Sequence, residues 1–344
     1  MMLRQILLHI FYQLNNERTI NAAYHLLRGK RSGQTIQDVG IFKLYPYFGI
    51  LRKLARPVFE DGVNSLGVEG WIRTDDNGYF TLTESGLEQV RKLALPFFDG
   101  WHYQGNEHIF YGRLSLIVQS LSNQSAGIRS FIPVQRNEEI QGWCRQFLLA
   151  SDFRSGMLQQ ALFHEMKTSM EQSGLSTLQK ELLVERLTGV GVTGIPWQQL
   201  SFEHEMTELD CQLLFISALH KWLDTIHQHN EQFPYLLKLA ENIRIDNVLT
   251  GSAYQTAQMY NQGYSLEQIS AMRRLKASTI EDHLVELAMN EPTFDSTPFI
   301  SHEQHEAVQQ AVRTYATRKL RILHDALPHL SYFQIRLALA KGEV

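Results

Sequence analysis

The side chains best suited to bind phosphate lie in one short run near the end of the sequence. Arg273, Arg274 and Lys276 are cations, and Ser278 and Thr279 follow them at once. Guanidinium and ammonium groups neutralise phosphates, and hydroxyls hydrogen-bond to phosphates or to base edges. These residue types at this spacing predict a small DNA-contacting surface.

A helix-turn-helix is predicted around this run, because two helix-start signals follow one another with a short basic turn between them. Ser265 and Gln268 form a capping box for the second helix, and Ser278 and Glu281 are expected to form one for the third. Gly263 ends the first helix. Two independent caps and a short turn are typical of the helix-turn-helix, which can place its third helix in a DNA groove.

The acidic start of the third helix weakens this interpretation. Glu281 and Asp282 precede His283, which is expected on the outer face of the helix beside Ser278 and Thr279. Asp282 repels a phosphate backbone, although both acids also complement the dipole at a helix N-terminus. We therefore expect DNA contact to be weak, and to select DNA structure more than DNA sequence.

Three further groups of side chains are candidates for phosphate contact. They are Arg313, Arg318, Lys319 and Arg321 in one long helix expected from about His302 to Leu327, Lys30, Arg31 and Gln34 in a loop expected to be mobile, and Arg73 in a β-hairpin. A solvated helix face is the favoured alternative for the first group. Asp75 and Asp76 weaken the case for Arg73.

The periodicity predicts a mainly α-helical chain in three parts. Residues 1–95 are expected to form a winged-helix-like domain that ends in a small β-hairpin around an Asp-Asn-Gly turn. Residues 96–250 are expected to be a helical middle region with a degenerate trihelical unit near 175–230. Residues 251–344 are expected to form a helix-turn-helix bundle.

Composition agrees with a soluble, cytoplasmic protein. The 344 residues are 44% hydrophobic and 20% charged, and the sequence contains no run of eighteen apolar residues, so no membrane span is expected. Two cysteines, Cys144 and Cys211, favour a reducing compartment. The net charge is −4, with +2 in residues 1–100, −5 in 101–250 and −1 in 251–344. Binding to DNA therefore has to rest on local patches.

Motifs for catalysis or metal binding are missing from the sequence. The run HEMKT at His164 lacks the second histidine of a metalloprotease helix, and HEQHE at His302 has the wrong order. There is no Walker loop and no dinucleotide fingerprint. We predict a protein that is not an enzyme and carries no cofactor and no metal.

The C-terminal motif resembles the helicase helix-turn-helix domain, in which small and apolar residues recur around the two helix starts. The matching residues are Gly263, Ser265, Ile269, Ser270, Arg273, Leu275, Ser278, Thr279, Ile280, His283 and Leu284. Such domains occur on some RecQ-type helicases and in free-standing YpbB-like proteins. The length of the chain and its RSGQTIQD loop also resemble the YpbB family.

This resemblance implies a non-enzymatic accessory protein for DNA repair or replication. Its partner would be a RecQ-type helicase, and its nucleic acid would be single-stranded or branched DNA, which places it in the cytoplasm with the nucleoid. Two alternatives remain open. One is a sequence-specific transcription regulator, which requires a base-reading helix and usually a symmetric dimer. The other is a protein-docking scaffold that never touches DNA, because trihelical units also dock proteins.

Overall fold

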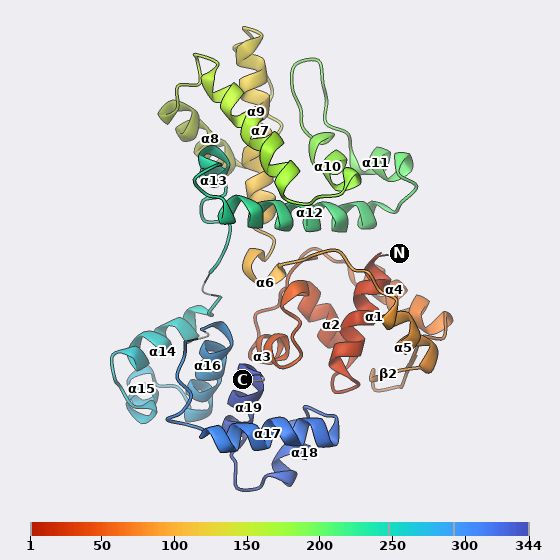
Figure 1. Cartoon of the computed structure of the whole chain (residues 1–344), viewed down its shortest axis with the longest axis vertical. Helices are drawn as coiled ribbons and strands as arrows, with labels where there is room; N and C mark the ends of the chain where they lie inside the picture. Colours follow the sequence, from red (N-terminus) through yellow and green to blue (C-terminus); the bar gives the residue numbers. More distant parts are fainter. Residues whose placement is uncertain (1, 247, 292, 343–344) are drawn as a thin grey trace. The chain divides into compact units, whose positions relative to one another are not determined.

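The computed structural model describes residues 2–246, 248–291 and 293–342 and contains two compact units (Figure 1). Unit 1 comprises Met1–Leu3 and Ala94–Ile245, and unit 2 comprises Arg4–Leu93 and Asp246–Val344. The first and last of the three expected parts therefore belong to one unit. No helix of the described residues is long and apolar enough to cross a membrane.

The N-terminal half of unit 2 has the elements of a winged helix. These are α1 (Met2–Leu14), α2 (Ile20–Leu27), α3 (Gly33–Ile41), the 3-10 turn η1 (Tyr45–Tyr47), α4 (Arg56–Val68), β1 (Ile72–Thr74), β2 (Phe80–Leu82) and α5 (Glu84–Arg91). A single isolated bridge joins Thr19, between α1 and α2, to Tyr79 just before β2. This order of helices, bridge and hairpin confirms the predicted winged-helix-like fold.

Buried and exposed side chains alternate along the two strands of the hairpin. Ile72 and Phe80 are buried, whereas Arg73 and Thr81 form an outward-facing pair across the strands. The Phe80 ring lies 4.4 Å from the ring of Phe11 on α1, measured between centroids. The sheet therefore fixes Arg73 on the outer surface, because side chains along a strand alternate between its two faces.

The C-terminal half of unit 2 is a bundle of helices around α16. Its elements are α14 (Gly251–Asn261), α15 (Leu266–Arg273), α16 (Ala277–Asn290), α17 (His302–Tyr315), α18 (Leu320–Ala326) and α19 (Tyr332–Lys341). α16 packs against α14, α15, α19 and, from the N-terminal half, α3. Ile280, Leu284 and Leu287 on α16 are fully buried. The helix that would read DNA is thus the central helix of this bundle.

The regular secondary structure of unit 1 is helical among the residues described, apart from a single bridge between Gly189 and Val192. It contains α6 (Gly100–Tyr103), α7 (Glu107–Ser125), α8 (Glu138–Ala150), α9 (Met157–Gln172), α10 (Thr177–Val184), α11 (Trp197–Glu203), α12 (Glu208–Gln228) and α13 (Pro234–Leu239). The segment expected to be trihelical forms α10, α11 and α12. The long α12 lies across α7, α9, α10 and α11 (Figure 1). Trp222 on α12 is fully buried and donates to the Ser169 hydroxyl at 2.7 Å.

Candidate nucleic-acid interface

The helix-turn-helix has the predicted caps at its second helix but not at its third. Ser265 and Gln268 form a complete capping box at α15, and Gly263 follows α14 with φ +89°. α16 begins two residues earlier than predicted, with Lys276 at the N-cap position and no side-chain cap. Ser278 lies inside the first turn, so the prediction that it caps the helix is wrong. Its hydroxyl is exposed instead of being bound to the backbone.

Arg273 holds two helices together and is not an outward-facing cation. Its guanidinium donates to the Ser252 carbonyl at 2.6 Å, to the Gln255 side-chain oxygen at 3.0 Å and to the Thr256 hydroxyl. Burial lowers the pKa of Arg273 from its usual value. Because its donors are used between α14 and α15, Arg273 is a poor candidate for phosphate contact.

His283 was predicted on the outer face of α16, and this prediction is wrong. Its side chain is buried, with 8% of the residue exposed, and its Nδ1 lies 2.8 Å from the Thr256 hydroxyl. Burial and the nearby charge of Arg273 lower the pKa of His283. His283 therefore belongs to the same interior polar contact as Arg273.

The exposed cations of this region flank the first turn of α16. Arg274 ends α15 in a left-handed conformation with φ +53°, and both Arg274 and Lys276 are exposed. Ser278 is exposed and Thr279 is half-buried directly after them. The turn and the positive end of the α16 dipole thus form a small surface that suits a phosphate.

The acids near the start of α16 share one cation inside unit 2, which offsets part of their charge. Asp282 forms an ion pair with Arg336 of α19 and accepts a hydrogen bond of 2.9 Å from Gln37 of α3. Glu281 lies 3.5 Å from the same guanidinium. The predicted repulsion of DNA by Asp282 is therefore reduced, because its charge is balanced by a cation that is itself largely buried.

The second basic group does not lie on one helix, so the expected helix from His302 to Leu327 is wrong. The chain breaks at Ala316, which has φ +47°, and the following loop joins α17 to α18. The Glu17 carboxylate accepts from the Thr317 hydroxyl at 2.8 Å and from the Arg318 backbone N–H at 2.6 Å. Arg313 consequently lies on α17, Arg318 and Lys319 on the loop, and Arg321 on α18.

This loop brings Lys319 to the hairpin that carries Arg73. The two cations line one polar hollow of about 390 Å³ with Asn16 and the hydroxyl residues Thr74, Tyr79 and Thr81. Asp75 also lines it, but its carboxylate accepts backbone N–H bonds from Asn77 at 3.0 Å and Tyr79 at 2.8 Å within the turn. We call this the hairpin hollow. Two cations and several hydroxyls make it suited to a phosphate.

The RSGQT segment was predicted to be a mobile loop, but it forms the start of α3. Ser32 caps this helix by accepting from the Thr35 backbone N–H. Arg31 donates to the Val248 and Leu249 carbonyls, and Gln34 donates to Asp38 at 2.8 Å. Arg31 and Gln34 are therefore engaged within unit 2, whereas Lys30 is exposed.

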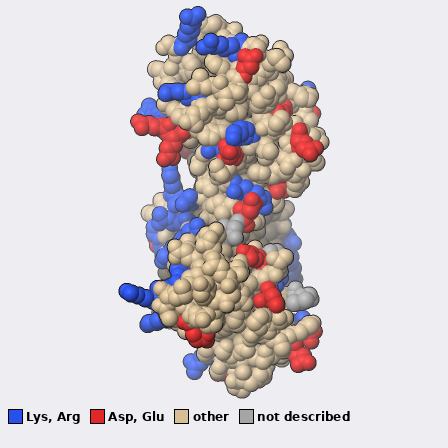
Figure 2. Space-filling view, turned by 90° about the vertical axis from the view of Figure 1, so that its left-hand side faces the viewer, with Lys and Arg blue, Asp and Glu red and all other residues tan. Residues whose placement is uncertain are grey.

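No single broad basic face accompanies these small groups on the side of the molecule that Figure 2 shows. Lys and Arg side chains there are interspersed with Asp and Glu, and most of the surface is neither. Among the described residues, no three His, Cys, Asp or Glu side chains are grouped so as to hold a metal ion.

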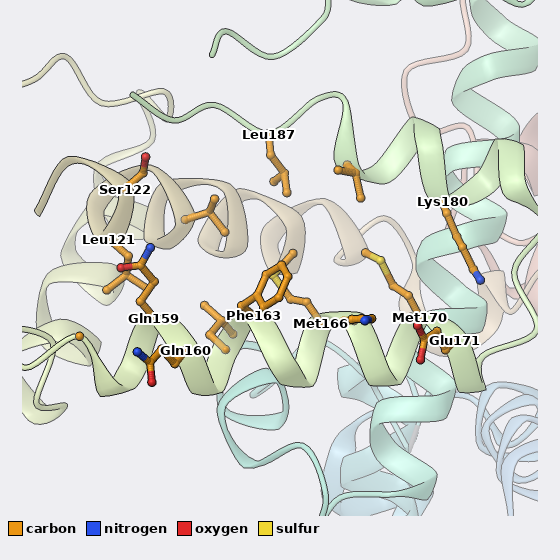
Figure 3. Close-up of a pocket in the computed structure, with 15 residues that line it drawn as sticks. Leu121, Ser122, Gln159, Gln160, Phe163, Met166, Met170, Glu171, Lys180 and Leu187 are labelled. Carbon is orange, nitrogen blue, oxygen red and sulfur yellow. The ribbon is translucent and has the colours of Figure 1, made fainter. Parts of the chain in front are cut away.

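Unit 1 carries hollows that the sequence analysis did not predict. A groove of about 770 Å³ runs along α9 and is lined mainly by apolar side chains from α7, α9 and α10 (Figure 3). We call it the α9 groove. A second hollow of about 930 Å³ is lined by Arg129, Arg145 and Arg154 with Phe131 and Phe153. One residue in the sequence could have indicated the groove. Phe163 is apolar, yet it lies outside the buried face of α9 that Leu158 and Leu162 form.

Comparison with known proteins supports the helix-turn-helix assignment and gives the family. Residues 252–339 match the family described as a helix-turn-helix domain. The chain is 31% identical to Protein YpbB of Bacillus subtilis (strain 168) over 337 residues, which cover 96% of this chain and 94% of that protein. The chain belongs to the YpbB family. No solved structure matches it significantly. A helix-turn-helix domain associates this family member with DNA-binding folds, and the turn at Arg274 and Lys276 is exposed on this domain.

Proposed function

We propose that this YpbB family member is a non-enzymatic, DNA-associated accessory protein that partners a RecQ-type helicase in DNA repair or replication. The helix-turn-helix domain supports the association with DNA. The resemblance of that domain to one found on some RecQ-type helicases supports the partner. A separate chain would then supply in trans what those helicases carry as part of themselves.

The observation that carries the DNA contact is the charge arrangement at the start of α16. Arg274 and Lys276 are exposed, whereas the two acids that follow the first turn share the guanidinium of Arg336. The local surface is therefore positive although the sequence of the helix begins with acids. Because like charges near a phosphate weaken binding, internal pairing of these acids favours contact.

The same structure favours recognition of DNA shape over recognition of sequence. Beyond its first turn α16 is largely buried against neighbouring helices, so its N-terminal end is the part most open to DNA. A recognition helix contacts base edges with its N-terminal residues, and the exposed residues at the start of α16 are the small Ala277 and Ser278. The hairpin hollow supplies a second place for phosphate through Arg73 and Lys319. Phosphate contacts position a protein on DNA without reading sequence, which agrees with a preference for branched or single-stranded DNA.

Fluorescence anisotropy with labelled single-stranded, duplex and forked DNA tests this proposal. The full chain is titrated into each DNA at several salt concentrations. We expect the tightest binding to forked or single-stranded DNA, with affinity falling steeply as salt rises. A palindromic duplex bound far more tightly than a fork would instead establish a sequence-specific regulator. No binding at low salt would leave protein docking as the function.

A pair of variants locates the contact. Arg274→Glu with Lys276→Glu is expected to weaken DNA binding by about tenfold or more and to flatten its salt dependence. The matched control, Lys43→Glu with Lys53→Glu, makes the same charge change at exposed positions of unit 2 outside both phosphate surfaces. Equal losses in the two variants would show a response to net charge alone and would refute the contact at α16.

The helicase partnership is tested separately with a purified RecQ-type helicase from the same organism. We expect a complex in size-exclusion chromatography, and we expect the helicase to unwind a fork faster when this protein is present. A helicase that neither binds the protein nor changes its unwinding rate would refute the partnership without affecting the DNA contact.

A further inference from the structure

The α9 groove is a straight apolar channel with polar groups at its two ends. In Figure 3, Phe163, Met166 and Met170 point from α9 into the groove, and Leu187 points toward them from the opposite side. Phe163, Met166 and Met170 are three and four residues apart, so they form one stripe on the helix. With Gln159 at one end, the stripe spans twelve residues, or roughly 16 Å at the helical rise per residue.

Part of the lining of this groove is open to solvent, although Leu162 and Met170, which also line it, are buried. Phe163 is 68% exposed and Val184 is 49% exposed. Exposed apolar surface that is gathered in a channel indicates an interaction site, whereas single exposed apolar residues do not. Met166 and Met170 add flexible, polarizable side chains that adapt to an apolar partner. The groove therefore suits an apolar surface of another molecule.

The walls restrict what form this molecule can take. α7, α9 and α10 satisfy their backbone groups within each helix, and beyond α10 the backbones of Gly189 and Val192 bond to each other. An extended peptide would find no backbone partners along the apolar part of the groove, and unpaired peptide groups are costly to bury. An α-helix satisfies its own backbone, so it is the peptide form that fits.

Charged side chains at the edge of the groove indicate the flanks of this helix. Lys167 and Lys180 line it together with one acid, Glu171. Within the described part of the chain neither lysine is engaged in an ion pair, and Lys167 is exposed. Carboxylates beside the apolar stripe of the bound helix would complement the two lysines.

A second copy of this chain is a poor occupant. Outside α9, the exposed large apolar side chains among the described residues are scattered over many elements, such as Val58 on α4, Leu149 on α8 and Phe202 on α11. None of the described helices carries three exposed large apolar side chains at helical spacing that could fill the groove. The matching stripe must therefore come from a different protein.

We propose that the α9 groove binds an amphipathic α-helix of a partner protein, with an apolar stripe about three turns long and acidic residues beside it. The groove is then the surface through which the chain would bind its partner. The identity of that partner rests on the proposed function. The chemistry of the groove itself is independent of DNA contact, because every lining residue belongs to unit 1.

Synthetic peptides test the groove directly on the full-length chain. The probe is a fluorescein-labelled helical peptide of about fifteen residues with leucines along one stripe and glutamates beside it. The comparison peptide has the same composition but no stripe. By anisotropy we expect the stripe peptide to bind at least about tenfold more tightly than the scrambled one. Equal binding of the two peptides would overturn the proposal.

Two substitutions of exposed phenylalanines identify the binding surface. Phe163→Asp is expected to weaken binding of the stripe peptide by about tenfold or more, because it places a charge in the apolar channel. Phe202→Asp is the matched control, since Phe202 is 85% exposed and lies outside the groove. This control is expected to change affinity by less than about twofold. A Phe163→Asp variant that binds normally would refute the site.

A charge swap tests the acidic flank. Lys167→Glu with Lys180→Glu is expected to weaken the glutamate peptide by about threefold to tenfold and to favour a version with lysine flanks. If the variant shows the same preference between the glutamate and lysine peptides as the wild type, the proposal that the bound helix has acidic flanks is wrong. Circular dichroism of each variant confirms that the fold is retained.

Rival occupants give different results. If Phe163→Asp converts a dimer into a monomer in analytical ultracentrifugation, the occupant is a second copy and the proposal is wrong. If native mass spectrometry finds a small apolar molecule that this variant loses, the groove is a ligand site and the proposal is also wrong. Displacement of the stripe peptide by a purified RecQ-type helicase would join this site to the proposed function. Peptide binding without displacement would refute the helicase as partner of this groove and leave the groove itself supported.

Discussion

The hairpin hollow of unit 2 and the α9 groove of unit 1 differ in every property that selects a ligand. The hollow is formed where a hairpin and a loop meet, and it offers Arg73, Lys319 and several hydroxyls. The groove is formed between helices, and Leu162, Phe163 and similar side chains line it. Loops and hairpins leave polar groups accessible, whereas paired helices leave apolar side chains between them. The two surfaces therefore suit different classes of partner.

Net charge agrees with this division. Unit 1 contains 11 Lys and Arg against 16 Asp and Glu, a balance of −5, whereas unit 2 contains 21 against 20, a balance of +1. The net negative charge of unit 1 repels a polyanion, whereas the small positive charge of unit 2 does not. The summed charge of a unit matters here because it acts over longer distances than a single contact. DNA is thus expected at unit 2, and an acidic helix has to rely on the local lysines of the groove.

The largest expected effect is on the stability of unit 2, at the contact between α5 and the chain just before the hairpin. A Cβ atom on Gly86 of α5 would overlap the carbonyl oxygen of Trp71, which lies just before β1. Gly86→Ala is expected to lower the free energy of unfolding by about 3 kcal/mol and to weaken DNA binding through the hairpin. Gly142→Ala on α8 of unit 1 meets nothing within 4 Å and is expected to raise stability by about 0.5–1 kcal/mol.

Urea unfolding followed by circular dichroism measures both glycine variants. If Gly86→Ala destabilises the protein but leaves DNA affinity unchanged, the hairpin does not contribute to DNA binding, and the contrast drawn between the hairpin hollow and the α9 groove is wrong. Destabilisation by Gly142→Ala would contradict the open surroundings of that position.

The next largest effect is on DNA affinity. Arg73→Glu with Lys319→Glu is expected to weaken binding of forked DNA by about tenfold or more and to reduce the slope of log affinity against log salt by about two. Binding of the stripe peptide should not change, because the groove lies in unit 1. The reverse result is expected for Phe163→Asp. Loss of both activities in either variant would show that the two surfaces are not independent.

The local elements could be predicted from the sequence because their signals are local. The capping box at Ser265, the turn at Gly263 and the alternation around Arg73 each involve residues within a few positions of one another. The winged-helix-like part, the helical middle region and the helix-turn-helix followed from these signals. The family resemblance rested on the same C-terminal residues.

The site could be predicted only in part, because its charges are set by residues far away in the sequence. Asp282 was expected to repel DNA, but its partners are Gln37 and Arg336, on two other helices. The helix expected to continue past Ala316 is interrupted where the following loop binds Glu17 near the N-terminal end of the chain. Such partners do not appear in any local pattern. The α9 groove was missed for the same reason, since its walls come from three helices.

A smaller effect is expected where Glu17 holds the loop that carries Lys319. Glu17→Ala leaves the Thr317 hydroxyl and the Arg318 backbone N–H without their acceptor and is expected to cost about 1–3 kcal/mol of stability. Because Lys319 is then less well positioned, forked DNA should bind a few-fold more weakly. Glu17→Gln keeps an acceptor oxygen and is expected to lose less stability and less affinity for forked DNA than Glu17→Ala. Hydrogen exchange of the 316–319 segment, measured by mass spectrometry, should rise in the alanine variant, and unchanged exchange would contradict this role.

The smallest effect concerns His283, which separates the buried part of α16 from its exposed first turn. Burial lowers the pKa of His283 below its usual value of 6.5, so the folded state keeps this ring neutral where the unfolded state takes up a proton. Stability from this residue is therefore present above about pH 6.5 and is lost as the pH falls below that value. His283→Asn keeps a polar group beside Thr256 but does not titrate. It should lose less stability than the wild type between pH 7.5 and pH 5.5, by under about 1 kcal/mol, in urea unfolding at the two pH values. An equal loss would place His283 in solvent, and α16 would then present a longer face to DNA than its buried position allows.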